Sequence, residues 1–164
     1  MSLENAKMYL AELGLDSRVL EFDVSSATVE LAAKALGVDS ARIAKTLSFV
    51  INDSCILILA AGDAKIDNKK YRAVFGAKAK MLAPDQVEQR IGHAVGGVCP
   101  FGIKPGIAVY LDKSLERFQT VFPACGSANS AIEMTVAELK KYSGAKAVID
   151  VCAVIKIPRP EGDS

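Results

Sequence analysis

Two apolar runs separated by one short turn limit the folds that are open to this chain. Residues 46–51 read TLSFVI, residues 54–62 read SCILILAAG, and only Asn52 and Asp53 lie between them. Two β-rich runs joined by turn residues in this way predict an antiparallel hairpin, and their apolar content places both strands near the centre of a sheet. The hairpin argues against a purely parallel sheet.

Helical and strand patterns alternate along the rest of the chain. Helical spacing, N-cap residues and terminal glycines predict helices over residues 3–13, 28–36, 66–75, 84–91 and 135–143. Further strands are predicted over 19–24, 78–82, 107–112, 120–123 and 131–134. In the first of these, Leu20, Phe22 and Val24 alternate with two carboxylates, which is the period of a half-buried strand. The pattern predicts an α/β (α+β) fold with a mixed, curled or barrel-like sheet flanked by helices.

The length of 164 residues is that of one ordinary domain, and no repeat or linker divides residues 1–164. The polar tail at 157–164 is expected to fray. A net charge of +1 provides no global field toward nucleic acid, so any RNA contact must be local and DNA binding is not expected. No signal-peptide pattern or membrane-spanning run is visible, so we expect a cytoplasmic protein without a membrane partner.

Metal and cofactor chemistry find no support in the sequence. The four cysteines are spaced too widely for CxxC motifs and the chain has a single histidine, so no metal site is expected. Cys55 and Cys152 lie in apolar runs, which is typical of buried thiols in a reduced protein. The motifs of serine hydrolases, P-loop NTPases, zincins and dinucleotide-binding folds are missing, and no cofactor is predicted.

Lys45 is the first candidate for a functional side chain. It lies in the apolar junction RIAKTL between a predicted short helix and a strand. One interpretation is a surface lysine that complements a helix dipole. The other is a cation directed into a pocket, where it would meet a phosphate, a carboxylate or a developing oxyanion.

The densest run of glycine and proline, residues 93–106, predicts a shaped loop. It holds four of the twelve glycines and two of the six prolines. Gly96, Gly97 and Gly102 would offer unobstructed backbone N–H groups to a carbonyl oxygen, while Pro100 stiffens the turn. A tight connection between two strands is the alternative.

Cys99 and His93 lie in the same loop and raise the possibility of a thiol nucleophile with its base. Sequence spacing does not establish that the two side chains meet, and the simpler interpretation of His93 is a loop residue that hydrogen-bonds the backbone. A second loop of small residues, CGSANS at 125–130, is the third candidate region.

Four segments together resemble the YbaK/prolyl-tRNA-synthetase-associated editing domain family. They are RIAKTL at 42–47, GDAKIDNKK at 62–70, GHAVGGVCPFG at 92–102 and the stretch 126–139, in the family's order and over about residues 20–150. The most specific are the lysine before Thr-Leu and the GGVxPFG loop. The resemblance implies a mixed, barrel-like α/β domain that hydrolyses the ester of mischarged aminoacyl-tRNA, with alanine, cysteine and serine as usual targets.

Residue roles follow from the same resemblance. Lys45 would be the essential lysine, holding the terminal adenosine phosphate or the ester region without acting as a nucleophile. Water would attack with help from the ribose hydroxyl of the tRNA. The amides of the first loop would polarise the carbonyl. The substrate-binding residues implied are Gly96, Gly97, Cys99, Pro100, Phe101, Gly102, Gly126, Ser127, Asn129 and Phe22.

Two departures from the family pattern bear on substrate choice. Many members have serine at the position of Cys99, and some have tyrosine at the position of Phe22. The expected partners are the acceptor end of aminoacyl-tRNA, touched by lysines such as Lys65, Lys69 and Lys70, and prolyl-tRNA synthetase. A free-standing, trans-acting monomer is expected. Two alternatives stay open, a non-catalytic module that binds tRNA or a synthetase, and a hydrolase that depends on Cys99.

Overall fold

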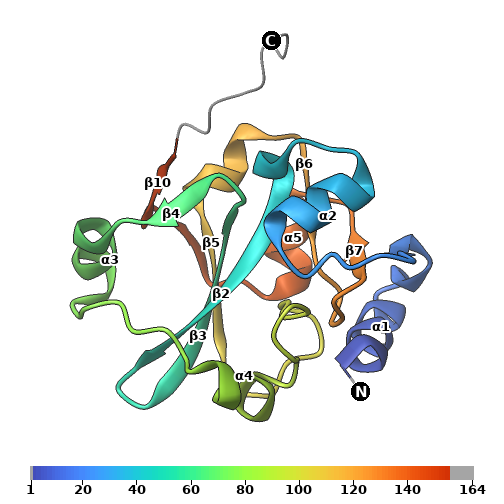
Figure 1. Ribbon diagram of the computed structural model, residues 1–164. Helices are drawn as coiled ribbons and strands as arrows, with labels where there is room; N and C mark the ends of the chain where they lie inside the picture. The colour runs from blue at the N-terminus through green and yellow to red at the C-terminus, as the bar shows by residue number, and fades with distance from the viewer. Residues whose placement is uncertain (1, 156–164) are drawn as a thin grey trace, which may run out of the picture.

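The computed structural model describes residues 2–155, which form a mixed sheet surrounded by helices (Figure 1). The helices are α1 Ser2–Glu12, α2 Val29–Leu36, α3 Asn68–Phe75, α4 Pro84–Ile91 and α5 Val136–Ser143, with 3-10 turns η1 Asp16–Arg18, η2 Ser40–Arg42 and η3 Lys113–Arg117. The strands are β1 Val19–Glu21, β2 Ile43–Ile51, β3 Ser54–Ala61, β4 Ala64–Ile66, β5 Ala108–Asp112, β6 Thr120–Pro123, β7 Ser130–Ile132, β8 Met134–Thr135, β9 Ala147–Ile149 and β10 Cys152–Val154.

The predicted hairpin is confirmed as β2 and β3, which form the centre of the main sheet. The two strands pair antiparallel, with Thr46 opposite Leu59. Asn52 and Asp53 both have positive φ, at 48° and 66°, as a two-residue turn that matches the strand twist requires. Residues 57–61 of β3 are fully buried, so this strand lies at the core of the fold.

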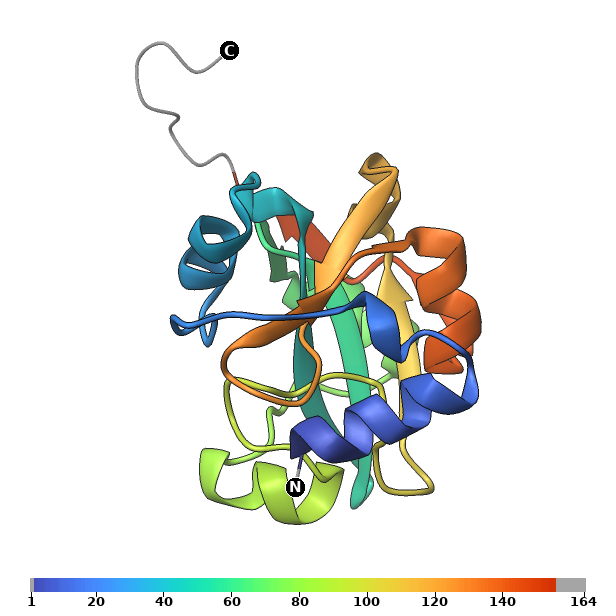
Figure 2. The same cartoon turned by 90° about the vertical axis from the view of Figure 1, so that its right-hand side faces the viewer.

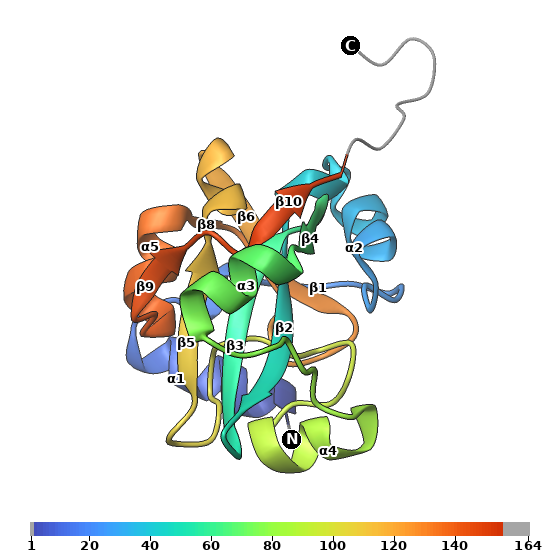
Figure 3. The same cartoon turned by 90° about the vertical axis from the view of Figure 1, so that its left-hand side faces the viewer.

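The sheet is mixed, as predicted. Its six strands run in the order β8-β6-β2-β3-β5-β9. The pairs β2–β6, β3–β5 and β5–β9 are parallel, while β2–β3 and β6–β8 are antiparallel. Two separate ladders, β1–β7 and β4–β10, complete the strand pairing of the described residues. The views in Figures 2 and 3 show the curled sheet with helices around it, so the predicted α/β class is confirmed.

Cap residues set the ends of the helices where the sequence places them. Gly37, Gly76, Gly92 and Gly144 end α2, α3, α4 and α5 in the left-handed conformation. Thr135 and Glu138 form the predicted capping box at the start of α5. These short local signals are reliable because each satisfies backbone groups that the helix itself leaves unpaired.

Several predicted strands differ from the structure. The strand at 19–24 ends at Glu21, and its predicted buried face is wrong, because Leu20 is 42% exposed and Val24 is 60% exposed. The stretch 78–82 contributes only a single bridge, between Met81 and Phe49. Strands β4, β9 and β10 were not predicted. The tail at 157–164 lies outside the described residues.

No helix among residues 2–155 is long and apolar enough to cross a membrane. The four cysteines are all buried and unpaired, including Cys55 and Cys152 as expected. Within the same residues no three His, Cys, Asp or Glu side chains lie in an arrangement that could hold a metal ion.

Candidate functional site

A cavity of about 260 Å³ lies between α2, the first half of β2, α4 and the first loop, residues 93–106. Its walls come from five segments, namely residues 26–29 and 32, residues 43–46 and 48, residues 81, 82, 84 and 87, residues 95, 96 and 98, and residues 122, 124, 130 and 131. Most of these side chains are apolar or small, and Lys45 is the only charged residue among them. The cavity therefore combines an uncharged lining with one cation.

Lys45 belongs to β2, because that strand begins at Ile43, three residues earlier than predicted. Its side chain is half-buried and lines the cavity, so it is not the fully exposed lysine of the simpler interpretation. The ammonium donates a hydrogen bond to the Ala64 carbonyl of β4. Burial lowers the pKa of this lysine, and Asp63 and Glu30 act in the opposite direction. The strand thus presents a positioned cation with hydrogen-bonding capacity left over.

Gly96 is the one glycine of the first loop, residues 93–106, that lines the cavity, where it lies with Val95 and Val98. Its φ is +93°, a conformation that favours glycine. Its N–H donates to no group within residues 2–155 and remains available to a ligand. The N–H of Gly97, by contrast, donates to the Ala94 carbonyl at 3.0 Å. Of the amides predicted to polarise a carbonyl, only that of Gly96 is both free and at the cavity.

Gly97 and Gly102 hold the first loop against its neighbours. A Cβ on Gly97 would lie 2.5 Å from the backbone nitrogen of Ser127, so the two candidate loops touch through their backbones. A Cβ on Gly102 would lie 2.5 Å from the carbonyl oxygen of Asn5 in α1. Neither residue lines the cavity, and Gly102 faces α1.

The side chains of Cys99 and His93 do meet, in the fully buried interior of the first loop. The thiol lies 3.5 Å from His93 Nε2, and that nitrogen is 2.6 Å from the Phe101 carbonyl oxygen. Because a carbonyl only accepts, Nε2 carries the proton and has no lone pair for the thiol. Burial raises the pKa of Cys99 to about 12 and lowers that of His93. A buried, protonated thiol is the opposite of an activated nucleophile, which removes the support for the cysteine hydrolase.

Pro100 and Phe101 are buried beside this pair and do not line the cavity. The ring of Phe101 contacts that of Tyr9 in α1, with centroids 6.2 Å apart. These two residues therefore anchor the loop to the core. Their predicted place in substrate binding stays a prediction.

The second loop is tied to the segment that precedes α2. Asn129 donates through Nδ2 to the Phe22 backbone carbonyl at 3.0 Å. The backbone carbonyl of Asn129 accepts from the Phe22 N–H at 2.8 Å. Ser127 Oγ lies 2.6 Å from Ser130 Oγ, and Ser130 lines the cavity. Figure 2 shows these two segments side by side across the sheet. Phe22, Gly126, Ser127 and Asn129 thus support the cavity wall from behind, without lining it.

Two cavity hydroxyls that the sequence analysis did not single out have no internal partner. Ser26 Oγ and Thr46 Oγ1 are both buried, both line the cavity, and neither makes a hydrogen bond within the described residues. A buried hydroxyl without a partner costs free energy. Both groups therefore stay available to a polar ligand. Thr46 belongs to the quoted motif RIAKTL, whereas Ser26 lies outside the motifs that the sequence analysis quotes.

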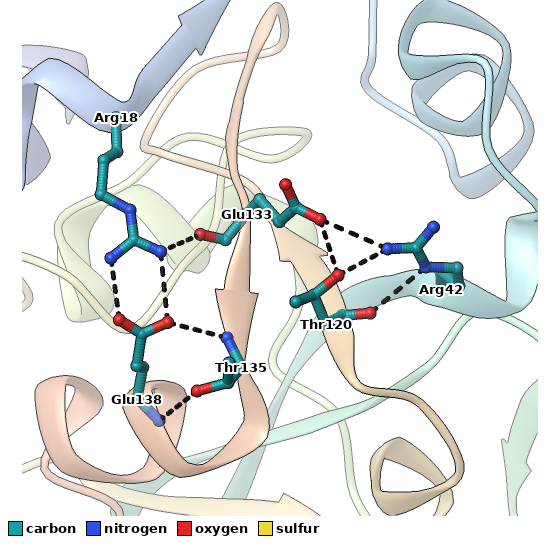
Figure 4. A network of polar contacts seen from close by, with 6 residues as sticks. All are labelled: Arg18, Arg42, Thr120, Glu133, Thr135 and Glu138. Carbon is teal, nitrogen blue, oxygen red and sulfur yellow. Dashed lines mark hydrogen bonds and ion pairs between the residues drawn. The ribbon is translucent and has the colours of Figure 1, made fainter.

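A polar network anchors the ends of the elements that carry the cavity walls (Figure 4). The Arg18 guanidinium binds both carboxylate oxygens of Glu138, at 2.8 and 3.2 Å, and this contact lowers the pKa of Glu138 to about 2. On the other side, Arg42 lies just before β2 and donates to the Thr120 hydroxyl at the start of β6. Glu133 links the halves, because its backbone carbonyl accepts from Arg18 and its carboxylate contacts Arg42.

The fold and the cavity define a mixed α/β domain with one lysine in a small-residue pocket beside a glycine-rich loop. A family model described as the aminoacyl-tRNA editing domain matches residues 23–142. The chain belongs to this family, as the resemblance implied. The match includes the whole cavity lining.

Individual relatives agree with this assignment. The chain is 57% identical to the uncharacterized protein YwhH of Bacillus subtilis, over 93% of this chain and 98% of that protein. It is 28% identical to EbsC of Enterococcus faecalis, a candidate Cys-tRNA(Pro)/Cys-tRNA(Cys) deacylase, over 65% of this chain and 66% of the relative. The solved structure of a candidate trans-editing enzyme for prolyl-tRNA synthetase superposes with a TM-score of 0.83 at 29% identity, covering 93% of this chain and 97% of that one.

Proposed function

We propose that this protein is a trans-acting aminoacyl-tRNA deacylase that hydrolyses the ester of tRNA mischarged with a small amino acid. Alanine, cysteine and serine are the candidate amino acids, and tRNA(Pro) is the first candidate tRNA. The observation that carries the proposal is Lys45, the one charge in a cavity that belongs to an aminoacyl-tRNA editing domain. Editing at such a site removes errors that binding alone discriminates poorly.

The hydrolysis needs no protein nucleophile. A water oxygen adds to the ester carbonyl carbon, the bond to the ribose oxygen breaks, and the free amino acid and the tRNA hydroxyl are released. The ribose hydroxyl next to the ester assists the water. Lys45 holds the terminal phosphate or the ester region, and the free N–H of Gly96 polarises the carbonyl as charge develops on its oxygen.

The lining of the cavity supports a small, uncharged aminoacyl side chain. Ala32, Ala44, Ala124 and Ala131 contribute small walls, and no carboxylate lines the space. A cationic side chain would therefore enter without a counter-ion, which is costly away from water. The hydroxyls of Ser26 and Thr46 can accept hydrogen bonds from the α-amino group or contact the ribose.

Single-turnover deacylation of Ala-, Cys-, Ser- and Pro-tRNA(Pro) tests the proposal. The wild type should hydrolyse at least one mischarged form and spare Pro-tRNA(Pro). Lys45→Ala should reduce that rate by about 10²-fold or more, the loss typical of a group that stabilises developing charge. Lys113→Ala removes an exposed lysine outside the cavity and serves as the matched control.

Circular dichroism and thermal unfolding test whether Lys45→Ala retains the fold. Full activity of a folded Lys45→Ala would contradict the role given to this lysine. Binding of charged tRNA without hydrolysis of any form would replace the deacylase by the non-catalytic binding module.

A further inference from the structure

The positive charge of this chain is concentrated in one short segment. Residues 65–80 contain six cations and only one carboxylate, Asp67; the cations are Lys65, Lys69, Lys70, Arg72, Lys78 and Lys80. The whole chain has a net charge of only +1, so the remaining residues carry more carboxylates than cations. The near-neutral total therefore conceals a strongly basic region, which we call the basic segment.

The two ends of the basic segment lie next to residues of the cavity. It runs from β4 through α3 and the following loop toward α4, across the face of the sheet that Figure 3 presents. At one end, the carbonyl of the preceding residue, Ala64, accepts the hydrogen bond of Lys45. At the other end, the Lys80 carbonyl accepts from Val50 of β2 at 2.9 Å, and the next residue, Met81, lines the cavity.

Most cations of the basic segment have no partner within the described part of the chain. Five of them are exposed, and their side chains make no ion pair or hydrogen bond within residues 2–155; they are Lys65, Lys69, Arg72, Lys78 and Lys80. Only Lys70 is paired, with Asp150 at 3.0 Å. Elsewhere, Arg18, Arg42 and Arg117 each bind a carboxylate of the same chain. Unpaired cations gathered in one segment mark a surface for an anionic partner.

We propose that the basic segment is the docking surface for the phosphate backbone of the acceptor arm of the aminoacyl-tRNA. This inference rests on the proposed function, because it assigns the route by which the RNA delivers its 3′ end to the cavity. Phosphates along β4, α3 and the loop before Met81 orient the arm, and Lys45 receives the terminal nucleotide in the cavity. Contacts to phosphate set position without reading sequence.

The direct test measures binding of a tRNA(Pro) transcript that carries no amino acid, by fluorescence anisotropy at salt concentrations between 50 and 200 mM. The test variant is Lys69→Gln/Arg72→Gln/Lys80→Gln. The matched control is Lys113→Gln/Lys140→Gln/Lys146→Gln, which removes three exposed, unpaired lysines that do not line the cavity and changes the net charge equally.

Each phosphate contact contributes a salt slope of about 0.9, which is about 3.5-fold in affinity over this fourfold salt range. Loss of three contacts should therefore reduce the ratio of the affinities at 50 and 200 mM salt by about 40-fold. The affinity at 50 mM should be at least tenfold weaker. The control variant should behave as the wild type. Equal weakening of both triple variants, or of neither, would overturn the proposal.

A second substrate separates docking from chemistry. On aminoacyl-tRNA the test variant should have a lower kcat/KM than the wild type. On an aminoacylated C-C-A trinucleotide, which has no acceptor stem, its kcat/KM should equal that of the wild type. Loss on both substrates would mean that the cavity is damaged, and would overturn the proposal. Binding of tRNA that depends on the basic segment, without hydrolysis by the wild type, would support docking and refute the deacylase.

Discussion

Gly97 offers a sharp test of how the two candidate loops hold the cavity together. Its backbone conformation is open to any residue, so an alanine there would suffer from contact alone. The added Cβ would lie 2.5 Å from the nitrogen of Ser127 and 2.6 Å from the carbonyl carbon of Gly126, both backbone atoms. Restoring ordinary van der Waals contact requires the loops to separate by about 1 Å. That movement would shift the wall that ends at Ser130.

Overpacking of this kind costs about 1–3 kcal/mol, and the upper value applies to Gly97→Ala because neither backbone atom can rotate away. For a chain of this size, about 3 kcal/mol corresponds to a fall in Tm of about 6–12 °C. Gly106→Ala is the control, because its φ of +86° is strained but its Cβ meets nothing within 4 Å, so we expect a loss of about 1 kcal/mol.

Urea unfolding and differential scanning calorimetry measure both variants, and the deacylation assay provides the second readout. Gly97→Ala should lose activity even at temperatures where it is folded, because the cavity wall moves. Gly106→Ala should keep its activity. If Gly97→Ala is no less stable than Gly106→Ala and equally active, then the loops do not depend on this backbone contact.

Four further substitutions test polar side chains whose pKa or hydrogen bonding is set by the fold. Glu138→Gln should lower the free energy of unfolding by about 1 kcal/mol at pH 7, a small value because the two side chains of the ion pair are 31–37% exposed. In the wild type the Arg18 contact stabilises the fold above about pH 4.5, and this stabilisation is lost as the pH falls toward the folded pKa of Glu138, about 2. Urea unfolding of the variant should not show this loss. Burial lowers the pKa of His93, so wild-type stability should fall as the pH drops below 6.5, and His93→Gln should flatten the profile between pH 7.5 and 5.5. Tyr71→Phe removes a buried hydroxyl without a partner and should not lower the urea midpoint, whereas Tyr9→Phe removes a hydroxyl that donates to a backbone carbonyl at 2.6 Å and should cost about 1 kcal/mol.

The elements that could be predicted from the sequence are those whose signals are local. The hairpin at Asn52 and Asp53, the capping box at Thr135, and the left-handed glycines that end α2 to α5 each depend on a few adjacent residues. Such signals act within one turn of chain and need no knowledge of distant partners. The fold class followed because the antiparallel hairpin excluded the purely parallel alternatives.

The strands that were missed or misplaced depend on distant partners. β4 and β10 are three residues each, and they pair with one another across more than eighty residues of sequence. The alternation at 19–24 predicted a buried face for Leu20, but β1 pairs only with β7, outside the main sheet, and Leu20 is left exposed. A period-2 pattern reports that a strand has two different faces, and not which face meets the core.

The residues of the candidate site show the same contrast between local signals and distant partners. Lys45 and Gly96 could be located because a charge in an apolar run and a glycine pair in a dense loop are unusual in sequence. The hydroxyls of Ser26 and Thr46 could not, since serine and threonine are ordinary at the ends of strands, and only the structure shows that both are buried, unpaired and in one cavity. Their unpaired state distinguishes them from Ser130, whose hydroxyl contacts that of Ser127. A ligand that hydrogen-bonds both hydroxyls would remove the free-energy cost of burying them without a partner.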